Sequence, residues 1–255
     1  MTALFAGLET GRAPGDAPVA FGGRLGAGEL LEAYRRGLFP LPAADVFAAA
    51  YAEARYERAV AAGEIALLPG GDPAEDPYAL AWWSPDPRPV LEPGGVRVPG
   101  RLARRLRNRL GWWTSADRAF GEVVEACAEG RQPAWLTGEL RAALLDLYAR
   151  GQAHSGEVWE GEELVGGVFG VAAGAVLSLD SMVGRRPDAA RVAVADLGAR
   201  WGAAGGRLLD AQWDGPHVRS LGARPMARAR YLEELAAPGG AGPLGTGPLP
   251  GSRLG

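Results

Sequence analysis

The chain has 255 residues, of which 47% are hydrophobic, which is enough for one large or two modest hydrophobic cores. All 27 basic residues are arginines, and the formal net charge of -3 excludes a uniformly basic nucleic-acid coat but not a local basic patch. The single Cys127 excludes an intramolecular disulfide, and two histidines disfavour a zinc site. These counts lead us to expect no metal. Because the sequence shows no leader pattern and no run of about 18 apolar residues, we also expect a cytoplasmic protein without a membrane anchor.

The N-terminal third predicts helices separated by loops. Residues 1–27 are rich in Gly and Ala without periodicity and predict a surface loop. Helical spacing predicts a helix from Glu29 to Leu38 and a second one from Ala44 to Ala62. The apolar face expected for the second helix consists of Val46, Phe47, Ala50, Tyr51 and Ala54. Three prolines then impose an extended path on Trp82–Leu91.

A run of arginines marks the next expected helix, Arg101–Leu110, whose leucines lie on one stripe. A solvated helix face is the ordinary explanation of such a run. In an acidic protein, arginines with no intervening acid favour a phosphate-binding surface instead. These arginines are Arg101, Arg104, Arg105, Arg107 and Arg109.

The second half alternates strands and helices. After a strand at Trp112, the pattern predicts helices over Ala116–Glu129 and Gly138–Arg150, and antiparallel strands over Ala153–Trp159, Glu163–Val171 and Ala175–Met182. A helix over Asp188–Ala203, a strand within Gly206–Trp213 and short helices from Pro216 and Ala227 follow. Residues 237–255, which contain Gly, Pro and Leu with almost no charge, predict a disordered tail.

This order of elements predicts an α+β fold in two domains. A smaller N-terminal α/β domain covers 1–110, with a helical insertion near 43–80, and a C-terminal domain over 111–236 is compatible with the GNAT type of acyltransferase. A CoA-dependent enzyme of that type places backbone amides against the pyrophosphate where the long helix begins. Here Pro187 removes a donor and Asp188 would repel phosphates, so we do not expect CoA as the donor.

Two polar residues interrupt the apolar strand at Gly206–Trp213. Period-two alternation puts Asp210 and Gln212 on one face. A carboxylate and an amide in an apolar strand are costly unless they have partners or a function. A satisfied pair at the end of a sheet is therefore the alternative to a catalytic site.

Many spaced segments together carry a family resemblance, among them Leu30–Pro40, Trp82–Arg88, Ala153–Trp159, Leu164–Gly167, Ser181-Met182, Asp210-x-Gln212 and Ser220–Ala223. In this order they resemble the bacterial leucyl/phenylalanyl-tRNA–protein transferases. The resemblance implies transfer of an aminoacyl group from charged tRNA to the N-terminal amine of a protein that begins with Arg or Lys. It also implies a GNAT-like C-terminal domain and no cofactor.

The resemblance assigns roles to individual residues. Asp210 and Gln212 match the catalytic pair, and we hypothesise that the Gln212 oxygen holds the amine while Asp210 orients that amide. Asp180 matches a glutamate thought to receive the basic side chain of the acceptor. The donor side-chain pocket is matched by Val168, Leu177, Met182, Leu197 and Leu209. The positions expected at the tRNA are Trp135 and Tyr34 near the 3′ adenosine, and Arg101, Arg104 and Arg105 on phosphates.

Departures from the family pattern leave alternatives open. Leu179 replaces a glycine, Asp180 is one methylene shorter than glutamate, and Leu41 replaces a tryptophan. One methylene in an apolar pocket changes the preference by about 1–3 kcal/mol, so the donated residue, of Leu, Phe or Met type, stays open. A relative that acylates a small peptide or amine is the alternative. A non-catalytic tRNA-binding module is disfavoured because both polar residues of the strand are kept, and a CoA acetyltransferase ranks last.

Overall fold

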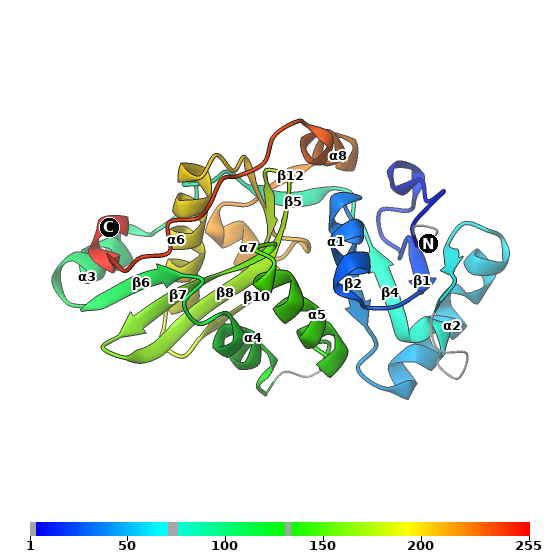
Figure 1. Ribbon diagram of the computed structural model, residues 1–255, viewed down its shortest axis with the longest axis horizontal. Coiled ribbons are helices and arrows are strands. Elements are labelled where there is room, and N and C mark those ends of the chain that lie inside the picture. The colour runs from blue at the N-terminus through cyan, green and yellow to red at the C-terminus, as the bar shows by residue number, and fades with distance from the viewer. Residues whose placement is uncertain (1–3, 71–75, 131–133) are drawn as a thin grey trace.

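The computed structural model describes residues 4–70, 76–130 and 134–255, which form a mixed α/β structure with two sheets (Figure 1). A four-stranded sheet has the order β2-β4-β1-β3, and a nine-stranded sheet has the order β12-β5-β11-β9-β8-β7-β6-β13 with β10 paired to β8. The small sheet and α2 lie at one end of the long axis, and α3 and the C-terminus lie at the other (Figure 1). No helix in these described ranges is long and apolar enough to cross a membrane.

The small sheet and its helices come from the first 83 residues. Their elements are η1 (Thr10–Arg12), β1 (Ala20–Gly22), α1 (Ala27–Arg35), β2 (Phe39–Pro42), α2 (Val46–Ala61), β3 (Ala66–Leu68), η2 (Pro77–Ala79) and β4 (Leu80–Trp83). The loop predicted over 1–27 is wrong at β1, which pairs in parallel with β3 and antiparallel with β4. This strand is short and fully buried, so its sequence shows no alternation.

Helix α2 forms where the sequence predicts it, but with a different buried face. Asp45 caps it by accepting a hydrogen bond from the Ala48 amide at 2.8 Å. The large side chains predicted to be buried are exposed: Val46 is 76%, Phe47 81% and Tyr51 67% exposed. Ala49 is buried instead, and the residues that pack against the small cluster of Phe21 and its neighbours are Ala52, Tyr56, Ala59 and Val60.

The large sheet and its helices come from the remainder of the chain. Its strands are β5 (Arg88–Leu91), β6 (Trp112–Ala116), β7 (Ala153–Glu160), β8 (Glu163–Ala173), β9 (Val176–Ser178), β10 (Ser181–Gly184), β11 (Leu208–Asp210), β12 (Arg224–Met226) and β13 (Leu249–Pro250). Its helices are α3 (Gly100–Asn108), α4 (Phe120–Ala128), α5 (Gly138–Ala149), α6 (Ala189–Ala203), α7 (Pro216–Leu221), α8 (Arg228–Ala236) and the short η3 (Gly251–Leu254).

The antiparallel pairing predicted for β7 and β8 is confirmed. The single strand predicted over Ala175–Met182 is instead two strands, β9 and β10, which pair with different stretches of β8. Between them, Leu179 and Asp180 leave the ladder. That break brings Asp180 to the site described below.

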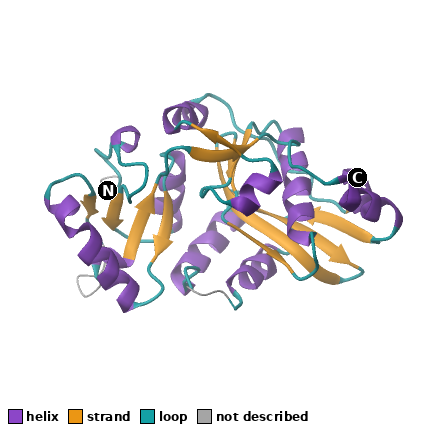
Figure 2. Cartoon of the chain, turned by 180° about the vertical axis from the view of Figure 1, so that it is seen from behind, coloured by secondary structure: helices purple, strands orange, loops and turns teal. Residues whose placement is uncertain are grey.

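Glycines in β8 let helices approach the sheet from both sides. A Cβ on Gly166 would lie 2.6 Å from the Cβ of Ala189 in α6, and one on Gly167 would lie 2.8 Å from Cγ2 of Val123 in α4. Because successive strand residues point to opposite faces, α6 covers one face of the sheet and α4 the other. Figure 2 shows the same layers from behind.

The change from one sheet to the other falls between β4 and β5, not at residue 110. Helix α3, also expected in the N-terminal domain, packs Leu102 and Leu106 into the core of the large sheet. A second hydrophobic cluster contains side chains from both halves, including Leu30, Trp82 and Phe120. This cluster therefore joins the two sheets.

The disordered tail expected over 237–255 is wrong. Strand β13 pairs with β6, and the amides of Ala241 and Gly242 donate to the carbonyls of Gly174 and Ala204 at 3.3 and 2.7 Å. Near the C-terminus, Arg253 donates to the fully buried carboxylate of Asp196. Backbone hydrogen bonds, a part-buried ion pair and the buried Leu244 hold this segment, and a single buried leucine leaves no hydrophobic periodicity in the sequence.

Candidate active site

Asp210, at the end of β11, is paired with a buried arginine. The Arg88 guanidinium donates from Nε to Oδ1 at 2.9 Å and from Nη2 to Oδ2 at 2.7 Å, a bidentate geometry. The Tyr231 hydroxyl donates to Oδ2 at 2.9 Å. Both charged side chains are fully buried, so each depends on the other for its charge compensation.

Arg88 also joins several elements around this pair. Its Nη1 donates to the Gly37 carbonyl at 3.3 Å, just after α1. The guanidinium carbon lies 4.8 Å from the ring centroid of Phe39 and 4.7 Å from that of Tyr231. The sequence did not single out Arg88 or Tyr231. The only indication was that Arg88 ends the extended proline-rich segment shared with the family.

Gln212 turns away from the strand on which the sequence placed it. Its backbone is left-handed, with φ of 60°, and its N–H donates to Oδ1 of Asp210 at 2.8 Å. Its side-chain Nε2 donates to Oδ1 of Asp180 at 2.6 Å. Asp210 therefore contacts Gln212 through its backbone N–H, and the side-chain amide contacts Asp180, so an orienting effect of Asp210 on that amide would be indirect.

Asp180, Tyr34, Ser178 and Gln212 form a polar group that we call the Asp180 cluster. The Tyr34 hydroxyl donates to Oδ2 of Asp180 at 2.8 Å, and the Ser178 hydroxyl donates to Oδ1 at 2.6 Å. Burial raises the pKa of Asp180 to about 7, although the hydrogen bonds from Ser178 and Tyr34 oppose the shift. Burial and the neighbouring Asp180 also raise the pKa of Tyr34. The cluster thus joins a carboxyl group that titrates near neutral pH to a fixed amide.

The five residues expected at the donor side chain are brought together around α6 and the centre of the sheet. Val168, Leu177, Leu197 and Leu209 belong to one hydrophobic cluster, Met182 packs against it, and the first four are fully buried. The His217 ring nitrogen Nε2 lies 3.3 Å from the Met182 sulfur. Met182 is therefore the member of this group nearest to the surface.

The residues expected at the tRNA do not form one surface. Trp135 lines a cavity of about 650 Å³ together with Trp83 and Trp213. Tyr34, expected near the adenosine, is 5% exposed and bonded within the Asp180 cluster. The arginines of α3 lie at the far end of the molecule from α2 (Figures 1 and 2). Arg101 and Arg104 are exposed there, and Arg105 pairs with Asp188 at 2.9 Å.

The backbone before α6 is already engaged. The amides of Arg185 and Arg186 both donate to the Val165 carbonyl, at 2.8 and 3.3 Å, and the Ala189 amide donates to the Arg186 carbonyl at 3.1 Å. These amides are therefore not arranged to receive a pyrophosphate. Within the described ranges no three His, Cys, Asp or Glu side chains are grouped to hold a metal ion.

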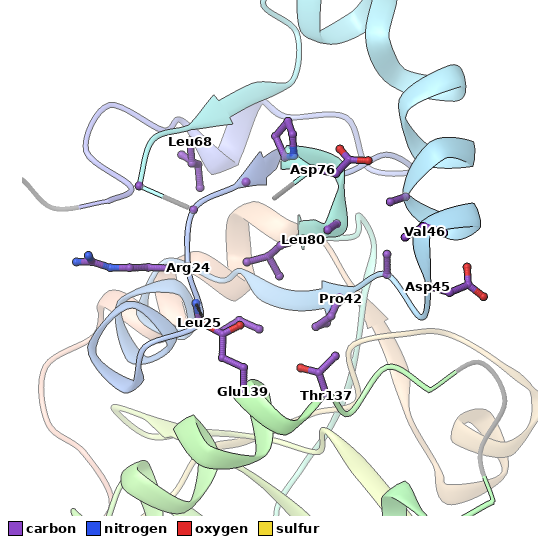
Figure 3. A pocket seen from close by; sticks show the side chains of 17 residues that line it. Arg24, Leu25, Pro42, Asp45, Val46, Leu68, Asp76, Leu80, Thr137 and Glu139 are labelled. Atoms are coloured by element: carbon purple, nitrogen blue, oxygen red, sulfur yellow. Dashed lines mark hydrogen bonds between the residues drawn. The ribbon is translucent and has the colours of Figure 1, made fainter. Parts of the chain in front are cut away.

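A larger cavity, of about 870 Å³, lies between the small sheet and the start of α5 (Figure 3). Its carboxylates accept hydrogen bonds from backbone amides. Asp45 and Asp76 accept from the amides of Ala48 and Tyr78, and Glu139 accepts from the amide of Leu25. Neither Asp210 nor any residue of the Asp180 cluster lines it.

Comparison with known proteins identifies the class of this chain. Residues 90–236 match the family described as leucyl/phenylalanyl-tRNA protein transferase. A transferase of that name from Chromohalobacter salexigens is 46% identical over 159 residues, which cover 61% of this chain and 62% of the relative. One from Thiobacillus denitrificans is 37% identical over 238 residues, which cover 91% of this chain and 89% of the relative. One from Xanthomonas euvesicatoria is 37% identical over 224 residues, which cover 86% of this chain and 76% of the relative.

The family that these matches share is one of aminoacyltransferases. The chain belongs to the leucyl/phenylalanyl-tRNA–protein transferase family. The match to the Chromohalobacter relative spans less than two thirds of that protein. Among solved structures, a GCN5-related N-acetyltransferase from Kribbella flavida matches with a TM-score of 0.37 and 16% identity, over 56% of this chain and 55% of that one. That similarity is too weak to support a conclusion.

Proposed function

We propose that this protein moves a hydrophobic amino acid of the Leu, Phe or Met type from aminoacyl-tRNA to the N-terminal amine of an acceptor protein that begins with Arg or Lys. The Asp180 cluster is the observation that carries the proposal, because it holds an amide and a carboxyl group together in a chain of this family. The partners are the 3′ end of the tRNA and the acceptor N-terminus. The reaction needs no cofactor, and its tRNA substrate favours the cytoplasm.

The chemistry requires mainly alignment. An α-amine has a pKa near 8, so a useful fraction is neutral at neutral pH. Its nitrogen attacks the ester carbonyl carbon, a C–N bond forms, and the C–O bond to the ribose breaks. The electron pair leaves on the 3′ oxygen, which takes up the proton that the amine loses. Correct alignment contributes up to roughly 7–11 kcal/mol to such a reaction.

The contacts divide the roles among three residues. Because Nε2 of Gln212 donates to Asp180, its Oε1 is oriented to accept an N–H from the incoming amine. Asp180 attracts the cationic side chain of the acceptor. Burial removes the water that would stabilise the Asp180 carboxylate, and the cation stabilises that charge in its place. Asp210 is satisfied by Arg88 and Tyr231 and acts by positioning the Gln212 backbone.

The test uses purified protein with separately charged, radiolabelled Leu-, Phe- and Met-tRNA and an Arg-starting peptide. Label should move to the peptide, and Gln212→Ala should abolish this transfer. A citrulline-starting peptide, which keeps the shape of arginine without its charge, should react with a higher KM. Full transfer by Gln212→Ala would refute the role given to that amide.

The alternative acceptor, a small peptide or amine, follows from two side chains beside the site. Leu179 is buried in the core, where the family has glycine, and Asp180 is shorter than glutamate. Label that moves to small amines and not to the Arg-starting peptide would favour this alternative. For the donor, we propose that the group around Met182 receives the aminoacyl side chain, so that Met182→Ala changes the ratio of leucyl to phenylalanyl transfer.

For the architecture, we propose a GNAT-like acyltransferase unit that begins at β5 and a smaller N-terminal unit that ends at β4. The order of the strands and helices supports this division. The shared cluster of Leu30, Trp82 and Phe120 would make the two units depend on each other for stability.

A further inference from the structure

Helix α2 exposes large side chains that the fold does not use. Tyr51 is 67% exposed and lines the cavity of about 650 Å³ that also contains Trp135 and Trp213. An exposed aromatic ring gains nothing from packing, so rings gathered at one cavity indicate a ligand or partner. This cavity lies between α2, β4 and the loop that follows β11.

One wall of the cavity is formed by the residue that follows Gln212, although no residue of the Asp180 cluster lines it. Trp213, which directly follows Gln212, is 40% exposed and lines the cavity. Its ring centroid lies 5.0 Å from that of Trp83 and 5.3 Å from that of Phe39, both in edge-on geometry, so its position is fixed. The indole N–H of Trp83 is buried, and the described residues offer it no hydrogen-bond acceptor. A ligand in this cavity therefore meets fixed rings, one of which belongs to the residue after Gln212.

Charge distinguishes the α2 wall from the opposite rim. Arg55, one helical turn after Tyr51, lies with its guanidinium carbon 5.2 Å from the Tyr56 ring centroid, and it forms no ion pair within 4.0 Å with Asp16, a carboxylate that also lines the cavity and attracts it electrostatically. On the other rim, Asp214 is paired with Arg219, and Asp86 accepts from the Arg228 amide at 3.0 Å. Ring faces beside one arginine are the usual composition of a site for single-stranded nucleic acid, in which bases stack and a cation meets the phosphate.

The geometry points to α2 as a binding wall for the single-stranded 3′ end of the aminoacyl-tRNA, with a base stacked on Tyr51 and Arg55 at the backbone phosphate. This inference rests on the proposed function, because the aminoacyl ester belongs to that 3′ end. The inference gives α2, which lies in the helical insertion near 43–80 expected from the sequence, a contact with the substrate.

The direct test is equilibrium binding of a short, fluorescently labelled single-stranded RNA that ends in CCA. Tyr51→Ala should raise its Kd by about 5- to 150-fold, the equivalent of about 1–3 kcal/mol for one stacked base. Tyr51→Phe keeps the ring and should bind like the wild type. Phe47→Ala is the matched control, since Phe47 is 81% exposed on the same helix and does not line the cavity. Leu41 lines the cavity, so Leu41→Trp supplies a new ring and should restore binding to Tyr51→Ala.

Steady-state transfer separates this inference from the proposed function. Tyr51→Ala should raise the KM for aminoacyl-tRNA and leave the KM for the acceptor peptide unchanged. A rise in the peptide KM alone would assign the cavity to the acceptor and overturn the inference. The inference would also be overturned if Tyr51→Ala bound the RNA as tightly as Phe47→Ala does, or if the wild type did not bind the RNA. Tight RNA binding by a wild type that transfers no label would refute the proposed function and leave the α2 site standing.

Discussion

Asp210→Asn tests whether the main role of the buried ion pair between Arg88 and Asp210 is to stabilise the fold. The substitution keeps the shape of the side chain, and the asparagine oxygen can still accept from the Gln212 amide. It removes the negative charge that faces Arg88, at hydrogen-bond distances of 2.7 and 2.9 Å and with both side chains fully buried. The guanidinium is then left buried without a counter-charge.

The magnitude follows from that burial. Breaking a buried pair by removing one partner costs about 3–5 kcal/mol. In a chain of this size each kcal/mol lowers the melting temperature by about 2–4 °C, so Asp210→Asn should melt about 6–20 °C below the wild type. The double variant Arg88→Met/Asp210→Asn removes both charges and should recover most of this loss.

The assay is thermal and urea unfolding of the variants beside a matched control. Asp214→Asn makes the same chemical change in an exposed pair with Arg219, where little loss of stability is expected because solvent screens the charges. If Asp210→Asn were no more destabilising than Asp214→Asn, the buried pair would not have the structural role given to it here.

Three further outcomes are expected. Because burial raises the pKa of Asp180 from 3.8 to about 7, the stability it contributes is present below pH 3.8 and is lost as the pH rises towards 7; the wild type should lose stability over this range relative to Asp180→Asn in thermal melts. Replacing both Arg101 and Arg104 with Ala should flatten the dependence of log K for tRNA on log salt concentration by about 1 for each arginine, and an unchanged slope would remove α3 from the interface. Arg253→Ala removes a donor from the buried Asp196 carboxylate and should cost about 1.5–3 kcal/mol in urea unfolding, whereas an unchanged midpoint would mean that the C-terminal segment is not anchored there.

The elements that could be predicted are those whose determinants are local. Helix α6 was expected over Asp188–Ala203 and spans Ala189–Ala203, since its apolar spacing and the Gly205 stop lie within one stretch of sequence. The hairpin of β7 and β8 was found because a glycine turn separates two apolar runs.

The buried face of α2 could not be predicted by the same reasoning. Its large residues and its alanines both repeat with helical spacing, so periodicity alone does not decide which set faces the sheet. The set that packs inward contains Ala49 and also Tyr56, whose ring contacts Phe21, and Phe47 and Tyr51 are left outside. The selection was made by tertiary packing.

The candidate site was only half visible in the sequence. Asp210 and Gln212 stood out as polar residues in an apolar strand and matched the family pattern. Asp180 also matched the family pattern, but its contact with Gln212 and the pairing of Arg88 with Asp210 were not predicted, because these contacts join residues 32 and 122 positions apart. No local spacing encodes such contacts, which depend on how β5, β11 and the β9–β10 break assemble.

The spacing of Asp210 and Gln212 now has a physical explanation that differs from a shared strand face. A carboxylate that accepts the backbone N–H two residues on forms an Asx turn, and the second residue can then take a left-handed backbone. The strand therefore ends at Asp210, and the turn directs the Gln212 amide to Asp180. Asp210→Ala removes the turn as well as the charge, so its inactivity would not distinguish chemistry from positioning. Asp210→Asn keeps the turn, and at a temperature where it is folded it should retain transfer if Asp210 acts through the position of Gln212.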